Sequence, residues 1–200
     1  MQQAISFLTE NDIVFKTLHH QHGNPFIPSR PAGFETLSKL ILEQQVSIES
    51  GMACFQKLES FVEQVTPKNI LKHTDEALRN CSISRQKILY LKALANAIEE
   101  NEIDLDSFST KFKEQVREEL IKIKGIGNCT IDVYLLFSLQ SPDIIPLGDI
   151  AIVNTIKELY GCKTNEDIKL VSENWKPYRS MATFFLWHHY LKKRNRKPLV

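Results

Sequence analysis

The sequence IKIKGIGNCTIDVYLLF, residues 121–137, places two glycines two positions apart between two apolar runs. Before it, Phe112, Val116 and Leu120 recur at four-residue spacing, which is typical of one face of an amphipathic helix. The run after the glycines is helical in pattern and mostly apolar. This part of the chain therefore predicts a helix, a short turn and a second helix over residues 120–138.

The two glycines allow two interpretations of the turn. Gly125 can adopt a positive φ without a Cβ clash, and Gly127 leaves no side chain at the start of the second helix. Such a turn is often only a helix C-cap and a tight corner. However, amides at a helix N-terminus are unpaired and carry the positive end of the helix dipole, so a phosphate can also bind there. Lys122 and Lys124 would add positive charge to that site.

The composition is that of a globular protein. The chain has 200 residues, of which 42% are hydrophobic, enough for one core or two small lobes. No apolar stretch reaches the length of a membrane span, and the N-terminus lacks a signal-peptide pattern. The four cysteines form no CxxC pair, which argues against zinc, an iron-sulfur cluster or a disulfide framework. The net charge of +1 does not by itself indicate a nucleic-acid binder.

Helical spacing of apolar residues dominates the remaining chain, whereas alternating strand patterns and Asn-Gly or Asp-Gly hairpin signals are missing. The clearest helical stretches are residues 34–44, 88–98 and 181–188. We predict an all-α protein of about eight to ten helices, with a mean length of about ten residues.

A second notable segment is PLGDIAIVNTIKELYG, residues 146–161. Pro146 and Gly148 interrupt the chain just before an amphipathic helix, so Asp149 is well placed as the N-cap of that helix. Taken alone, such an aspartate is most often only a cap. A glycine hairpin followed at this distance by a glycine-preceded aspartate is much rarer than either part.

Four segments together resemble the helix-hairpin-helix DNA glycosylase superfamily, in its 3-methyladenine glycosylase II branch. They occur in the family's order and cover nearly all of residues 4–191. The segments are FETLSKLILEQQVSIESG (34–51), SISRQKILYLKALANAI (82–98), LIKIKGIGNCTIDVYLLFSLQSPDIIPLGDIAI (120–152) and WKPYRSMATFFLWHHYL (175–191).

The resemblance implies a two-lobed helical fold with an active-site cleft between the lobes. We expect residues 1–200 to form a single glycosylase unit. We expect residues 36–115 to form the first lobe. Residues 1–35 and 116–200 would form the second lobe, which contains the hairpin. Composition alone does not fix this boundary.

The resemblance also implies roles for individual residues. Asp149 would be the catalytic carboxylate, and Gln45 or its neighbour Gln44 would be the wedge pushed into the duplex. The hairpin that binds DNA phosphate would consist of Lys122, Lys124, Gly125, Ile126, Gly127 and Cys129. Main-chain carbonyls of Ile121, Ile123 and Gly125 would match those that hold a sodium or potassium ion in the family.

The base pocket is implied to contain Trp187, with Tyr134 and Tyr178 behind it, because aromatic faces suit a cationic base. At position 129 this sequence differs from the family pattern in two ways. Cys129 replaces the lysine that forms a Schiff base in strand-cutting members, and a thiol cannot form that imine, so a monofunctional enzyme is implied. It also replaces a pocket tryptophan common in this branch, which leaves the substrate choice open.

The expected function is base excision repair: the enzyme would flip out alkylated purines such as 3-methyladenine and hydrolyse their N-glycosidic bonds. We expect a monomer that binds damaged double-stranded DNA and no membrane, located in the bacterial cytoplasm at the nucleoid or in a eukaryotic nucleus. We expect no cofactor other than the hairpin ion. One alternative is a non-catalytic DNA-binding module with the same hairpin. Another is a helical protein-interaction scaffold, which would leave the glycine turn unexplained.

Overall fold

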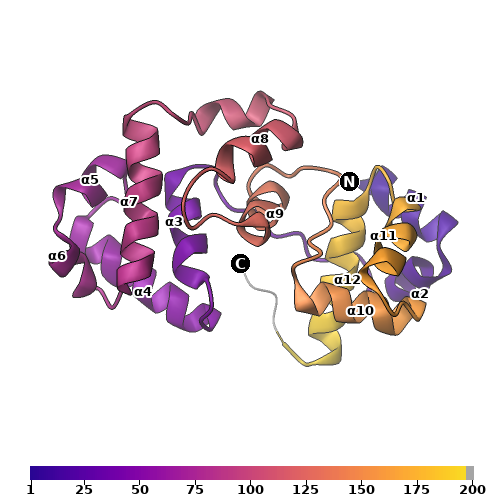
Figure 1. Ribbon diagram of the computed structural model, residues 1–200. Coiled ribbons are helices and arrows are strands. Elements are labelled where there is room, and N and C mark those ends of the chain that lie inside the picture. Colours follow the sequence, from indigo (N-terminus) through magenta and orange to yellow (C-terminus); the bar gives the residue numbers. More distant parts are fainter. Residues whose placement is uncertain (197–200) are drawn as a thin grey trace. The chain divides into compact units, whose positions relative to one another are not determined.

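The computed structural model describes residues 1–196, in which every regular element is helical (Figure 1). The predicted all-α fold is therefore confirmed. The expected eight to ten helices were too few, since the described residues form twelve α-helices. Two of these, α5 and α6, have only six and five residues. None of the helices in residues 1–196 combines the length and the apolar character that a membrane span requires.

The chain divides into two compact units. We call residues 31–134 the central unit, and residues 1–30 together with 135–200 the terminal unit. Helix α9 (Asn128–Phe137) begins in the central unit and ends in the terminal unit.

The central unit is built around α7, against which α3, α5 and α6 pack, while α4 packs on α3. Leu37 and Ile41 of α3 and Leu91 and Leu94 of α7 are fully buried, as their helical spacing predicts. Besides the start of α9, its elements are α3 (Phe34–Glu43), α4 (Ile48–Val62), α5 (Pro67–Lys72), α6 (Asp75–Arg79), α7 (Arg85–Glu99), the 3₁₀ helix η1 (Asp106–Thr110) and α8 (Lys113–Leu120).

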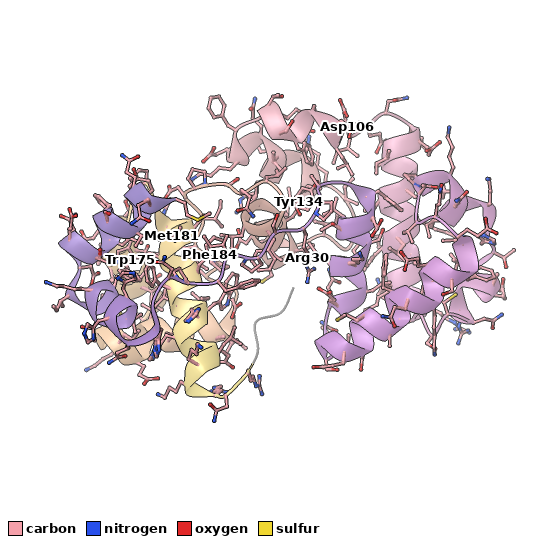
Figure 2. All side chains as sticks on the ribbon, turned by 180° about the vertical axis from the view of Figure 1, so that it is seen from behind. Arg30, Asp106, Tyr134, Trp175, Met181 and Phe184 are labelled. Carbon is pink, nitrogen blue, oxygen red and sulfur yellow. The ribbon has the colours of Figure 1, made fainter. Side chains whose placement is uncertain are left out.

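The terminal unit is built around α12, which packs against α1, α2 and α10. Its interior holds Phe15, Trp175 and Phe185, with the rings of Phe15 and Trp175 5.3 Å apart edge to face. Its helices are α1 (Gln2–Asn11), α2 (Ile13–His22), α10 (Ile150–Tyr160), α11 (Asn165–Glu173) and α12 (Arg179–Lys193). Figure 2 shows Trp175, Met181 and Phe184 in this unit.

The division of the chain differs from the expected lobes. The glycine hairpin lies in the central unit, which extends to residue 134 rather than to 115. The reason is packing: the ring of Tyr90 on α7 covers Gly125, and the side chain of Gln44 donates a hydrogen bond to the Gly125 carbonyl. These contacts join segments far apart in sequence, so no local sequence pattern predicts them.

Candidate active site and phosphate-binding hairpin

Asp149 lies directly before α10, and its side chain caps that helix. One carboxylate oxygen, Oδ1, accepts hydrogen bonds from the backbone N–H groups of Ala151 at 2.7 Å and Ile152 at 3.2 Å. The predicted N-cap role is therefore confirmed. These bonds satisfy two helix amides that have no partner within the helix, and they fix the orientation of the carboxylate.

The second oxygen of Asp149 has a different partner. Oδ2 accepts a hydrogen bond from the indole Nε1–H of Trp187 on α12, at 3.0 Å. Trp187 and Asp149 are both half-buried. A helix cap needs only one carboxylate oxygen, so the bond to Trp187 shows that α12 also positions this side chain. The structure thus brings together the predicted catalytic carboxylate and the first predicted residue of the base pocket.

An aromatic group surrounds Trp187 in the terminal unit. The ring centroid of Phe137 lies 5.4 Å from that of Trp187, and the centroid of Phe184 lies 6.2 Å from it. Phe137 and Phe184 stack on each other, and the Arg30 guanidinium lies 5.9 Å from the Phe137 centroid. Phe184 and Arg30 are marked in Figure 2. Phe137 and Trp187 are only half-buried, so they offer aromatic surface next to a carboxylate.

The first turns of α12 also hold the loop that leads to Asp149. Arg179 makes a bidentate ion pair with Asp143, with N–O distances of 2.7 and 2.6 Å. The hydroxyl of Ser180 donates to the carbonyl of Ser141 and accepts from the N–H of Ile144. One helix therefore fixes both the start of the loop and the carboxylate at its end.

The other two predicted pocket residues pack against different side chains. Tyr178 is the N-cap residue of α12, nine residues before Trp187 and about 13 Å from it along the helix axis, and its ring packs against Phe7. Tyr134 is fully buried in the central unit, where its hydroxyl accepts a hydrogen bond from the N–H of Gly33. Burial raises the pKa of Tyr134. A side chain without exposed surface offers no face to a base, so the structure does not support a pocket role for Tyr134.

The two glycines of the hairpin differ. Gly125 has a φ of +93°, and a Cβ atom there would lie 2.0 Å from the ring of Tyr90. The fold therefore requires glycine at this position. Gly127 does not have a positive φ, and a Cβ atom there would meet nothing within 4 Å. Packing within the central unit therefore does not require glycine at position 127. The open space beside Gly127 is available to a ligand.

Around Gly127 the hairpin is exposed and carries positive charge. Lys122, Lys124 and Cys129 are exposed, whereas Ile126 is buried and anchors the turn. The first amides of α9, which starts at Asn128, point out of the helix N-terminus and have no partner within the helix. The geometry fits the expected phosphate site.

The side chain of Arg117 on α8 binds two residues in the first turns of α9. Its guanidinium donates to Asn128 Oδ1 at 2.9 Å and pairs with the carboxylate of Asp132. Burial raises the pKa of Asp132, and the hydrogen bond from Arg117 opposes that shift. The two helices of the hairpin are thus joined by one side chain, which the sequence analysis did not single out.

The two candidate wedge residues are separated by the structure. Gln44 points inward, and its Nε2 donates to the carbonyl of Gly125 at 2.8 Å and to Thr130 Oγ1 at 3.1 Å. Gln45 is exposed and has a φ of 56°. The amide of Gln44 is already bound within the central unit, which favours Gln45 over Gln44 as the wedge. For Gln45 that role stays a prediction.

The expected alkali ion has a donor set of main-chain carbonyls at Ile121, Ile123 and Gly125. The Ile123 carbonyl accepts from the N–H of Ile126, and the Gly125 carbonyl accepts from Gln44. A carbonyl oxygen has two lone pairs, so both still have one for a cation. The residues fit the ion, which stays a prediction. No group of three His, Cys, Asp or Glu side chains in residues 1–196 is arranged to hold a metal.

Comparison with known proteins links both regions to DNA repair. The model of a family described as "HhH-GPD superfamily base excision DNA repair protein" matches residues 38–180. The alkylbase DNA glycosidase-like protein mag2 of Schizosaccharomyces pombe is 33% identical over 174 residues, which cover 83% of this chain and 81% of that protein.

Two solved structures share the fold over nearly the whole chain. The DNA-3-methyladenine glycosidase of Bacillus halodurans has a TM-score of 0.84 and 27% identity, and the match covers 95% of this chain and 89% of that one. The 3-methyladenine DNA glycosylase of Schizosaccharomyces pombe in complex with abasic DNA has a TM-score of 0.82 and 29% identity, with 92% and 95% covered.

Proposed function

Since the chain belongs to the HhH-GPD superfamily of base excision DNA repair proteins, we propose that this DNA glycosylase is monofunctional and removes alkylated purines such as 3-methyladenine from duplex DNA. The observation that carries the proposal is the hydrogen bond between Trp187 and Asp149 beside Phe137. It puts an aromatic surface and a carboxylate side by side, and these are the two groups that removal of a cationic base needs.

The reaction follows from these groups. An alkylated purine carries positive charge, so it leaves readily and needs no strong general acid. The face of Trp187 or Phe137 would attract the cationic base. The carboxylate of Asp149 would stabilise the oxocarbenium sugar and orient or deprotonate the attacking water. Since Oδ1 accepts two helix amides and Oδ2 only the indole N–H, Oδ2 is the oxygen with more capacity left for this task.

The monofunctional part of the proposal rests on Cys129. In strand-cutting relatives this position carries the lysine that attacks the sugar, and a thiol cannot form the Schiff base. Cys129 is exposed on the first turn of α9. The product should therefore be an abasic site in an intact strand.

A panel of duplexes tests the proposal directly. Each duplex carries one lesion, such as 3-methyladenine or hypoxanthine, and free base is measured after incubation with the purified protein. We expect release of 3-methyladenine by the parent protein and much slower release by Asp149→Asn. If the parent binds the duplexes but releases no base from any of them, the alternative of a non-catalytic DNA-binding module holds.

A further inference from the structure

The side chain of Gln44 connects two parts of the central unit. Gln44 is the residue that follows α3, and its NH₂ group has two hydrogens. One hydrogen bond goes to the carbonyl of Gly125 in the hairpin turn, and the other goes to the hydroxyl of Thr130 on the first turn of α9. Both donors are therefore used, and both acceptors belong to the hairpin.

The turn that carries Gln45 is also held from its other side. Nζ of Lys87 on α7 donates to the carbonyl of Leu42 at 2.7 Å. Burial lowers the pKa of Lys87. Between these two anchors, Gln45 has a left-handed backbone and an exposed side chain. A residue other than glycine keeps that conformation only where its surroundings enforce it, and such residues gather at functional sites.

The hairpin has supports that do not involve Gln44. Gly125 lies under the ring of Tyr90, and Arg117 binds Asn128 and Asp132. In the turn at residues 42–46, the Lys87 side chain binds the Leu42 carbonyl and the Gln44 side chain binds the hairpin. Loss of the Gln44 amide should therefore release the turn while the hairpin keeps its shape.

From these contacts we propose that Gln44 is a positioning residue that ties the wedge residue Gln45 to the phosphate-binding hairpin. When the hairpin engages the DNA backbone, the Gln44 amide holds Gln45 in the conformation that fills the gap left by the extruded base. Gln44 itself touches no DNA. The inference rests on the proposed function, because it gives Gln44 a part in extruding the damaged base.

The test compares two substrates with Gln44→Met, which keeps the length of the side chain but removes both donors. In one duplex the lesion is paired, and in the other it faces an abasic position, where extrusion costs little. We expect single-turnover base release to slow at least about tenfold with the paired lesion and less than about threefold with the unpaired one. Gln45→Ala should show the same pattern. The double variant should be no slower than Gln45→Ala, because Gln44 acts through Gln45.

Equal slowing on both duplexes, or additive effects in the double variant, would overturn the proposal in favour of a merely structural bond. Melting curves check the fold of each variant. If Gln44→Met does not fold, Thr130→Val replaces it, since that change removes only one acceptor and should give the same pattern with a smaller effect.

A second readout does not depend on catalysis. A 2-aminopurine next to the lesion brightens when the stack opens, and it can be followed in the Asp149→Asn background. We expect Gln44→Met to weaken this signal while DNA affinity stays within about threefold. If the parent protein releases no base but the fluorescence responds as expected, the proposed function fails and the positioning role of Gln44 stands. An unchanged signal contradicts the positioning role whatever the activity.

Discussion

The proposed catalytic corner of the terminal unit, formed by Asp149 and its partner Trp187, and the proposed phosphate-binding hairpin of the central unit would use different atoms. At Asp149, side-chain oxygens are held by three N–H donors, so the proposed function would reside in a side chain that the fold orients. At the hairpin the proposed phosphate ligands are backbone amides, and the fold leaves the space beside Gly127 open. A substitution at Asp149 should therefore change chemistry at little cost in stability, whereas substitutions in the hairpin should change stability or binding.

The largest expected effect separates chemistry from binding at Asp149. Asp149→Asn can keep the bonds to the α10 amides, but its NH₂ group cannot accept from the indole of Trp187. One lost hydrogen bond costs about 1 kcal/mol of stability. We expect base release at least about a hundredfold slower, which corresponds to about 2.7 kcal/mol, with duplex affinity equal or slightly tighter, since a carboxylate repels phosphate.

Single-turnover base release, a binding titration and a melting curve on both proteins check this expectation. Release close to the parental rate by a folded variant would mean that Asp149 is only a helix cap, and the contrast between the two regions would then disappear.

Gly125→Ala is expected to cost the most stability in the hairpin. The new methyl group would collide with Tyr90, and alanine would be strained at a φ of +93°. Together these should lower the free energy of unfolding by about 2 kcal/mol, seen as a lower denaturant midpoint. Tyr90→Ala in the same chain should recover part of the loss by removing the collision. A fully stable Gly125→Ala protein would show that the hairpin turn differs from the one described.

Trp187→Phe tests whether the indole N–H positions the catalytic side chain. The change keeps an aromatic ring beside Phe137 and removes the donor to Asp149 Oδ2. We expect base release about tenfold slower with little change in DNA affinity, since one preorganising hydrogen bond is lost. Phe184→Leu is the matched control, because it alters the aromatic group without touching the carboxylate. Equal slowing in both variants would assign the effect of Trp187 to packing.

Gly127→Ala should weaken binding without loss of stability. The methyl group enters open space in the free protein but stands where a phosphate would approach the α9 amides. We expect about fivefold weaker binding to duplexes of any sequence, because phosphate contacts carry no base information. The melting temperature should stay parental, unlike that of Gly125→Ala. Unchanged affinity, or an effect confined to one sequence, would contradict the hairpin assignment.

The smallest expected effect is the absence of a covalent intermediate. With Cys129 at the lyase position, borohydride added during turnover should trap no protein-DNA adduct, and strand breaks should appear only after alkali. Gel electrophoresis under denaturing conditions detects both products. A trapped adduct would require another lysine as nucleophile, of which Lys124 is the first candidate, and the hairpin would then supply a side chain as well as its backbone.

Local signals explain which site residues the sequence could predict. Gly125, Gly127 and Asp149 stand next to chain breaks and helix starts, and the structure places them in the expected turn and cap. The burial of Tyr134 could not be predicted, because α9 is apolar on nearly all sides and periodicity does not show which face is buried. Gln44 and Gln45 are adjacent and chemically identical. The structure tells them apart, since Gln44 binds the hairpin whereas Gln45 is exposed and has a left-handed backbone.

Contacts over long sequence distances explain what the sequence could not predict. Phe137 and Arg30 join the catalytic corner through a contact between the end of α9 and the N-terminal segment. Neither residue stands in a recognisable pattern. The boundary of the central unit was misplaced for the same reason, since the packing of Tyr90 on Gly125 has no signature in either segment.

The dependence of the catalytic corner on α12 has a consequence for the order of synthesis. Asp149 leaves the ribosome 38 residues before Trp187, its partner. A nascent or prematurely ended chain that stops before α12 already contains every residue of the central unit, hairpin included, but neither Arg179 nor Trp187. Such a fragment would contain the proposed phosphate-binding hairpin but not the helix that positions Asp149, so α12 completes the proposed catalytic corner.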